Sequence, residues 1–146
     1  MYLVPSHDRP GIADERAPKL VMNVVSTSKQ ETSAALAAAF PLASALNAFI
    51  RVVVFRIVPY PLDLNHPVVS PFRTAQSCIS GFHELPANSH ISIYYCRDVA
   101  EGMRTALAPA TLVLVGRKKC WWQRGEGRVI RLLRSQGHVP FVIEAR

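Results

Sequence analysis

The sequence is poor in the residues that mark disulfide-stapled or metal-bound small proteins. It has three cysteines, an odd number, and they share no spacing typical of a metal or redox site. The five histidines are equally scattered, so no zinc site can be recognised. We therefore expect no disulfide framework, no metal and a reducing, cytoplasmic location.

Long hydrophobic runs are also lacking. The nearest to a membrane span is 32–50, which has no charged residue but is dominated by alanine and contains Pro41. No signal-peptide pattern precedes it. Five of its residues fall on one stripe at helical spacing, namely Leu36, Phe40, Ala43, Asn47 and Ile50. The pattern predicts a buried helix bent at Pro41, with no membrane span.

Acidic residues are scarce, at 10 against 17 lysines and arginines, and the positive excess is concentrated in one segment. Residues 117–134 hold seven basic residues and one acidic residue, a net charge of +6 out of the chain's +7. A clustered excess favours a local anionic ligand or a protein partner over a nucleic-acid coat.

Short apolar runs alternate with helical segments along the chain. We expect a flexible leader over 1–18 and a single α/β domain over 19–146. Strands are expected at Leu20–Val25, Arg51–Val58, His90–Cys96, Thr111–Val115 and Val139–Glu144. Helices are expected from the capping box at Ser28 to about Ile50, and at Phe72–Leu85, Val99–Leu107 and Arg128–Ser135. This predicts a Rossmann-like or flavodoxin-like sheet of five parallel strands in the order 3-2-1-4-5, with helices on both faces.

Such folds bind ligands at the carboxyl ends of the strands, where the strand order reverses. The segment after Thr111–Val115 is the most informative, because a glycine-containing basic loop leads there into a helix whose N–H groups attract anions. The candidate ligand-binding residues are Ser26, Thr27, Val58, Gly116, Arg117, Lys118, Lys119, Gly125, Gly127 and Arg128. The alternative is that these basic side chains are merely solvated.

Aromatic and apolar residues near the end of the chain favour self-association. Trp121 and Trp122 either stack on a ligand or pack at an interface or over a sheet edge. Between them and the basic loop, Cys120 is either a passive small hydrophobe or a redox sensor. The final strand holds no charge inside it that would prevent edge pairing. We expect a homodimer whose candidate interface is Trp121, Trp122, Val139, Phe141, Val142 and Ile143.

Catalytic patterns are absent from the sequence. Asp98 and Glu101 lie near the expected ligand edge, but no nucleophile–base arrangement accompanies them. The pattern therefore predicts a binding module that is not an enzyme.

Four segments together resemble the universal stress protein family. KLVMNVVSTS (19–28) looks like its first strand and turn, and RVVVFRIVPYP (51–61) like its second strand. LVLVGRKK (112–119) with GRVIRLLRSQGHVPFVIEA (127–145) is similar to its fourth strand, last helix and final strand. The resemblance implies a five-stranded parallel α/β sheet, a dimer formed through the last strand, and ATP binding in one branch.

The chain departs from the ATP-binding branch at three positions. Those members carry an acidic residue where Val25 stands here, and a second loop glycine where Lys119 stands. Gly127 comes two residues early for the third glycine, and Arg128 follows it in place of a hydroxyl residue. The resemblance thus implies a non-catalytic regulatory or binding module that does not bind ATP in the family's manner. Two alternatives stay open: ATP, AMP or another phosphorylated ligand at the basic loop, and a protein- or nucleic-acid-binding surface over 117–134.

Overall fold

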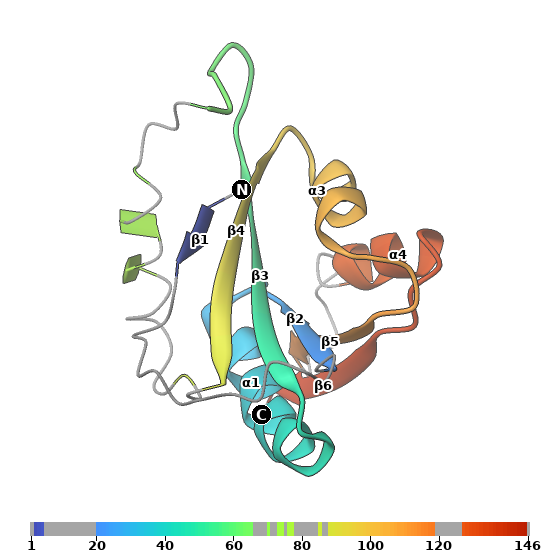
Figure 1. Cartoon of the computed structure of the whole chain (residues 1–146). Coiled ribbons are helices and arrows are strands. Elements are labelled where there is room, and N and C mark those ends of the chain that lie inside the picture. Colours follow the sequence, from blue (N-terminus) through green and yellow to red (C-terminus); the bar gives the residue numbers. More distant parts are fainter. Residues whose placement is uncertain are drawn as a thin grey trace.

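The computed structural model describes residues 2–4, 20–65, 70, 73–74, 76–77, 85, 88–118 and 127–145. Its strands are β1 (Tyr2–Val4), β2 (Val21–Val25), β3 (Phe49–Ile57), β4 (Ser89–Cys96), β5 (Leu112–Lys118) and β6 (Phe141–Ala145). The helices bounded within the described ranges are α1 (Lys29–Leu46), α3 (Val99–Ala106) and α4 (Gly127–Ser135). Figure 1 shows these elements built around one twisted sheet.

The sheet confirms the predicted strand order. Its strands lie in the order β1-β4-β3-β2-β5-β6, and β2 to β6 are all parallel. In order of appearance, these five are the predicted 3-2-1-4-5. The sixth strand, β1, pairs antiparallel with the outer side of β4. It falls in the expected leader, whose remaining residues, 1 and 5–18, lie outside the described ones.

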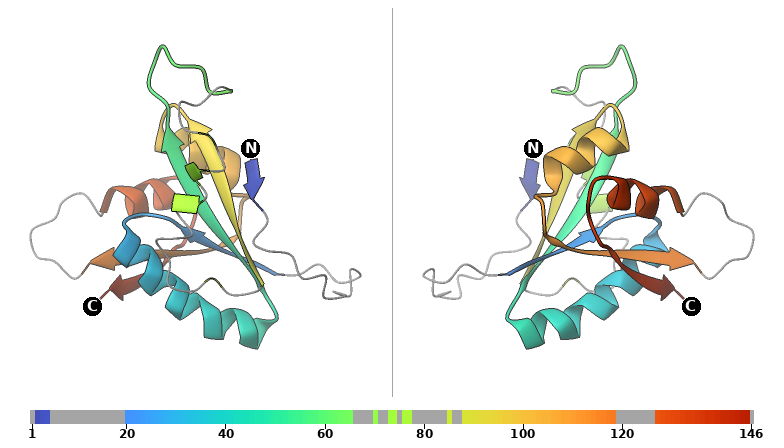
Figure 2. Two further views of the ribbon diagram at one scale, coloured as in Figure 1. Left: turned by 90° about the vertical axis from the view of Figure 1, so that its left-hand side faces the viewer. Right: turned by 90° about the vertical axis from the view of Figure 1, so that its right-hand side faces the viewer.

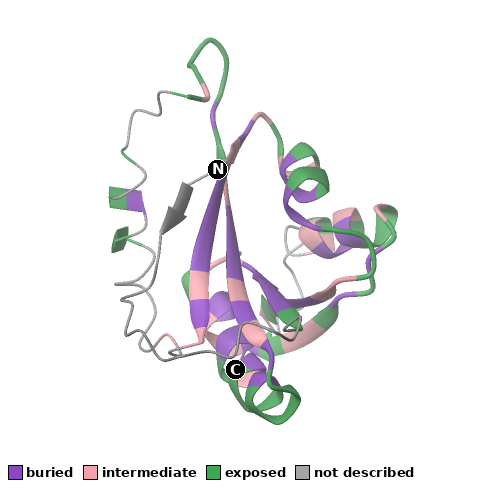
Figure 3. Ribbon diagram, in the orientation of Figure 1, coloured by how far each residue is buried: buried purple, intermediate pink, exposed green. Residues whose placement is uncertain are grey.

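Helices cover both faces of the sheet, as predicted. One core cluster joins α1 to alternate residues of the strands, among them Val24, Val52 and Ile93. The other joins α3 and α4 to the intervening residues, among them Val25, Val53 and Val115. Figure 2 shows α1 on one side of the sheet and α3 with α4 on the other, and Figure 3 shows the buried strand centres between them. Successive side chains of a strand point to opposite faces of the sheet, so each strand contributes alternate residues to the two cores.

Helix α1 begins where the capping box places it. Ser28 Oγ accepts a hydrogen bond from the Glu31 N–H at 3.3 Å, and the Glu31 carboxylate accepts one from the Ser28 N–H at 3.4 Å. The helix continues through Pro41 and ends at Asn47, which adopts a left-handed conformation with φ 49°. The predicted end near Ile50 was therefore wrong, because the left-handed residue stops the helix and lets β3 begin at Phe49.

The predicted buried stripe of α1 was correct at Leu36 and Ala43 and wrong at the other three positions, since Phe40 and Asn47 are exposed and Ile50 lies in β3. Phe40 is 51% exposed, whereas the buried face is made mainly of small residues such as Ala35, Ala39 and Ala43. Alanines let the helix lie close to the sheet, and a phenylalanine fits only beside that contact. Of the predicted helix 72–85, Arg73, Thr74, Gln76 and Ser77 are helical, and most of the others lie outside the described part.

Candidate functional site

A pocket of about 210 Å³ lies at the carboxyl ends of two neighbouring parallel strands, β2 and β5. The chain leaves β2 through α1 toward β3, and leaves β5 through α4 toward β6, on opposite sides. This is the point where the strand order reverses, and doubly wound folds bind ligands there. The sequence predicted a ligand site at this edge, and three of its candidates, Ser26, Thr27 and Gly116, line the pocket.

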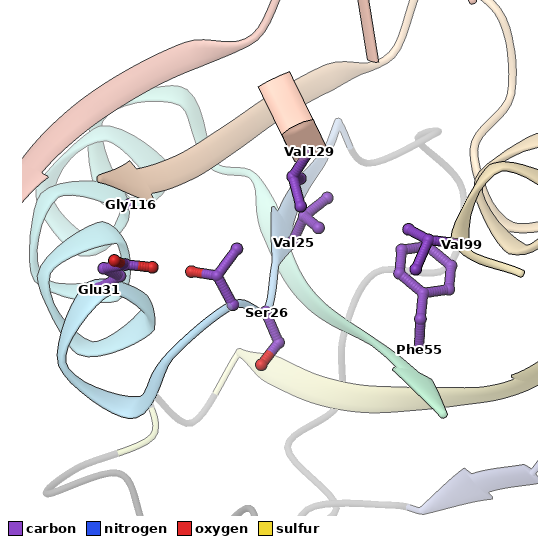
Figure 4. Close-up of a pocket in the computed structure, with 8 residues that line it drawn as sticks. Val25, Ser26, Glu31, Phe55, Val99, Gly116 and Val129 are labelled. Atoms are coloured by element: carbon purple, nitrogen blue, oxygen red, sulfur yellow. The ribbon is translucent and has the colours of Figure 1, made fainter. Parts of the chain in front are cut away.

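One side of the pocket is apolar. Val25 at the end of β2, Phe55 of β3, Val99 at the start of α3 and Val129 in the first turn of α4 form it. Figure 4 shows Val25 next to Val129, and Phe55 next to Val99. Val25 is fully packed, at 1% exposure, while the other three are half-buried. Four elements therefore converge to make a hydrophobic wall.

The other side of the pocket is polar and acidic. It is formed by Ser26, Thr27 and Glu31, which surround the start of α1, and by Gly116 of β5. Glu31 is only 4% exposed, and Figure 4 shows its carboxylate on the α1 side, beside Gly116. The Thr27 hydroxyl oxygen is buried and has no hydrogen-bond partner within the described part of the chain. A buried carboxylate and a buried acceptor favour hydrogen-bond donors in this half.

The N-terminus of α1 is partly capped by its own chain. The Thr27 N–H donates to Thr32 Oγ1 at 3.0 Å, and the Thr32 N–H donates to the Ser28 carbonyl at 2.9 Å. The capping box adds the N–H groups of Ser28 and Glu31. These donors are the groups that a phosphate would otherwise bind at a helix start. With the buried carboxylate of Glu31 next to them, the position disfavours an anion.

Gly116 serves helix packing. A Cβ at this position would lie 1.9 Å from the Glu31 carbonyl oxygen, so β5 and the first turn of α1 are in direct backbone contact. The sequence placed Gly116, Arg117 and Lys118 in a loop, and this was wrong: they extend β5 and pair with β6. The parallel ladder continues because the final strand offers partners, Ile143 opposite Gly116 and Ala145 opposite Lys118.

The remaining predicted ligand residues lie elsewhere or outside the description. Val58 is 7% exposed and is not among the residues that line the pocket. Arg117 and Arg128 are exposed, and Gly127 begins α4. Lys119, Gly125, Cys120 and the tryptophan pair Trp121 and Trp122 lie outside the described residues.

The loop after β3 is held by one arginine. Arg97, just after β4, donates to the carbonyls of Val58 and Leu62 at 3.0 and 2.7 Å. Its guanidinium lies 4.1 Å from the centre of the Tyr60 ring. Asp98, next in the chain, caps α3 by accepting a hydrogen bond from the Glu101 N–H at 2.8 Å. These side chains therefore fix loop and helix geometry beside the pocket.

Sequence reasoning missed half of the pocket. Glu31 was recognised only as a capping residue, and Phe55, Val99 and Val129 look like ordinary core positions in the sequence. The one available signal was the capping box itself, because it puts a carboxylate at the carboxyl edge of the sheet. Only the packing of α3 and α4 against that edge brings the apolar wall to it.

A second polar cluster lies near the amino ends of the strands. Arg51 donates to Asn23 Oδ1 at 2.8 Å, to the Tyr94 hydroxyl at 3.3 Å and to the Ala106 carbonyl at the end of α3. Burial, together with the charge of Arg51, lowers the pKa of the neighbouring His90. This network holds the C-terminal end of α3 on the sheet, whereas the N-terminal end of the same helix lies at the pocket.

The predicted interface residues that are described lie along the outer edge of the sheet. Val139 and Phe141 are 83% and 58% exposed, and Val142 and Ile143 are half-buried. The opposite edge is covered by β1.

Among the described residues, no group of three His, Cys, Asp or Glu side chains is arranged to hold a metal ion. Cys96 is buried and unpaired. Within the same ranges, none of the helices combines the length and the apolar character needed to cross a membrane.

Comparison with protein-family models finds no match, and comparison with curated proteins finds none either. The relation to universal stress proteins therefore stays a prediction from the residues quoted above.

Proposed function

We propose that this chain is a cytoplasmic, non-catalytic regulatory or binding module similar to the universal stress proteins, and that it does not bind ATP in their manner. The α/β sheet with its pocket at the carboxyl edge supports a binding role. The observation that carries the proposal is the acidic, self-capped start of α1 in that pocket.

The acidic start of α1 argues against a phosphate. Glu31 is 4% exposed on the polar wall, and the N–H groups around it already donate to Ser28, Thr32 and Glu31 itself. A triphosphate would bring several negative charges toward a buried carboxylate, beside a helix start where the N–H groups of Ser28 and Glu31 already have acceptors.

The small volume of the pocket and the valine at the end of β2 also argue against nucleotide binding. About 210 Å³ is smaller than the roughly 300–1,000 Å³ of pockets that hold drug-sized ligands. Val25, where ATP-binding relatives carry an acid, is 1% exposed and packs with the α3 and α4 core. A valine offers no acceptor to a nucleotide.

Calorimetry on the full chain with ATP and AMP tests this proposal. We expect no saturable binding tighter than the millimolar range. A dissociation constant below about ten micromolar, roughly −7 kcal/mol, would overturn it. A competition with inorganic phosphate distinguishes a true nucleotide site from simple attraction of an anion.

A second candidate function is supported by the arginines of α4. Arg128, Arg131 and Arg134 are all exposed on this nine-residue helix. They form a basic surface suited to an acidic protein segment or to nucleic acid. Titration with a short oligonucleotide at two salt concentrations tests it, because phosphate contacts give a steep salt slope. Replacing the three arginines by glutamine should reduce that slope clearly, and Arg104→Gln on the exposed side of α3 is the matched control.

We also propose a homodimer formed through β6. This strand ends the sheet, and within the described ranges no strand pairs with its outer side. The other edge of the sheet is the three-residue strand β1, so the longer β6 and the exposed Phe141 support pairing between two copies at β6. Its test is given at the scale of the whole molecule below.

A further inference from the structure

We propose that the pocket between β2 and β5 binds a compact primary amine with an apolar body, its ammonium group against Glu31 and Thr27. This inference rests on the proposed binding role and names the ligand class of the same site. The juxtaposition that carries it is a small pocket whose lining combines one buried carboxylate and one buried hydroxyl, without a hydrogen-bond partner among the described residues, with four apolar side chains.

The volume limits the ligand to about the size of a substituted ring. The pocket has about 210 Å³, and an apolar cavity of roughly 150 Å³ is known to hold benzene. The remaining space accommodates a short chain of two or three atoms. Such a ligand is far smaller than a nucleotide.

The apolar wall selects the body of the ligand. Val25, Val99 and Val129 present branched aliphatic groups from three different elements, and Phe55 presents a ring. Figure 4 shows Phe55 and Val99 at the end away from Glu31, with Val25 and Val129 between. An aryl or branched alkyl group seated there removes apolar area from water on both sides of the contact.

The acidic wall selects the head group. Glu31 is 4% exposed, so a charge on its carboxylate is weakly screened by water. An ammonium group carries three donors, which suit this carboxylate and the buried Thr27 hydroxyl oxygen. A carboxylate or phosphate head in the same place would meet like charge.

The neighbouring positive charges act at longer range. Arg117, at the end of β5, and Arg128, in the first turn of α4, are exposed and face water. Their repulsion of a cation is screened at physiological salt. Glu31 is the acidic residue among those that line the pocket.

Three isosteric probes test the head group: phenethylamine, phenethyl alcohol and phenylacetate. Each is titrated into the full-length protein and followed by amide chemical shifts in two-dimensional NMR. We expect shifts at Ser26, Thr27, Phe55 and Val99 with the amine, at least tenfold weaker binding of the alcohol, and no binding of the acid. Equal affinities, or preference for phenylacetate, would overturn the proposal.

Glu31→Gln isolates the charge, because glutamine preserves the capping box while removing the negative charge. We expect this variant to bind phenethylamine at least tenfold more weakly and phenethyl alcohol as before. Thr27→Val removes the hydroxyl at nearly constant volume and should weaken the amine severalfold. Glu101→Gln is the matched control, since Glu101 is also in the first turn of a helix but is exposed; its affinity should equal that of the unmodified chain.

The experiments distinguish an incorrect amine site from an incorrect proposed function. If Glu31→Gln binds the amine as well as the unmodified chain while ATP still does not bind, the amine site alone is wrong. If ATP binds with micromolar affinity, the proposed function is wrong whatever the amine does. Urea unfolding of each variant verifies that the pocket is intact.

Discussion

At the scale of single residues, the roles of Gly116 and Cys96 depend on their surroundings and cannot be inferred from the residue type alone. Gly116 stands where a phosphate-binding glycine was expected, yet its lack of a Cβ admits the backbone of α1. Cys96 is a thiol at the carboxyl end of β4, yet its surroundings keep it protonated. Both roles follow from what each atom contacts.

Gly116→Ala is expected to destabilise the fold. The added Cβ would overlap the Glu31 carbonyl oxygen at 1.9 Å, so strand or helix must shift. Overpacking of this kind costs about 1–3 kcal/mol, measured as the free energy of unfolding in urea. Gly127→Ala is the control, because a Cβ there meets only the Arg131 side chain at 3.6 Å and should leave stability unchanged or raised. Equal stability of the two variants would contradict the packing role.

Cys96 is expected to react slowly with a thiol reagent in the native protein. Burial raises its pKa, and the nearby carboxylates of Glu101 and Asp98 add to the shift, so less thiolate is present at neutral pH. In a chain carrying Cys78→Ser and Cys120→Ser, alkylation by iodoacetamide should be much slower without urea than with it. Similar rates in both conditions would show that Cys96 is accessible in the fold.

At the scale of elements, α1 links stability to the pocket. Its first turn supplies the capping box that starts the helix and also the carboxylate on the polar wall. Its small buried residues set how closely the helix approaches β5. The helix start is therefore both a folding signal and part of the candidate site.

Ser28→Ala is expected to cost about 1 kcal/mol of unfolding free energy, because the Glu31 N–H loses its acceptor. The same variant loosens Glu31 and should broaden the amide signals of Ser26 and Thr27 in NMR spectra. Ser44→Ala, at an exposed position inside the same helix, is the control and should be neutral or slightly stabilising. A neutral Ser28→Ala would mean that the cap contributes little to the fold.

At the scale of the whole molecule, the two edges of the sheet differ. The antiparallel strand β1 covers β4, whereas β6 ends the sheet beside exposed apolar residues. The edge strand β1 has only three residues and so offers few backbone groups for pairing, whereas β6 has five. This asymmetry is the structural basis of the proposed dimer.

Phe141→Lys is expected to convert the dimer to a monomer in sedimentation experiments at micromolar concentration, because a buried lysine at the twofold interface costs several kcal/mol. Ile57→Lys is the matched control: Ile57 is 48% exposed and is separated from β6 by β2 and β5. It should remain dimeric. A monomeric unmodified chain would contradict the proposal outright.

The sequence by itself determined the five parallel strands, their order and the start of α1. Continuous apolar runs such as 51–54 mark strands buried on both faces, and the capping box at Ser28 is a local hydrogen-bond pattern that needs no distant partner. Such signals depend only on residues close together in the sequence, so they can be recognised without knowledge of the tertiary structure. The expected edge for ligands followed from the order of the elements alone.

Only the tertiary structure decided which residues meet at that edge. The extension of β5 through Lys118 depends on pairing with β6, and β1 depends on pairing with β4 across most of the chain. The exposure of Phe40 and the contact of Gly116 with Glu31 depend on where α1 lies on the sheet. These are contacts between distant segments, and their geometry is set by packing density and backbone approach, which no local pattern encodes.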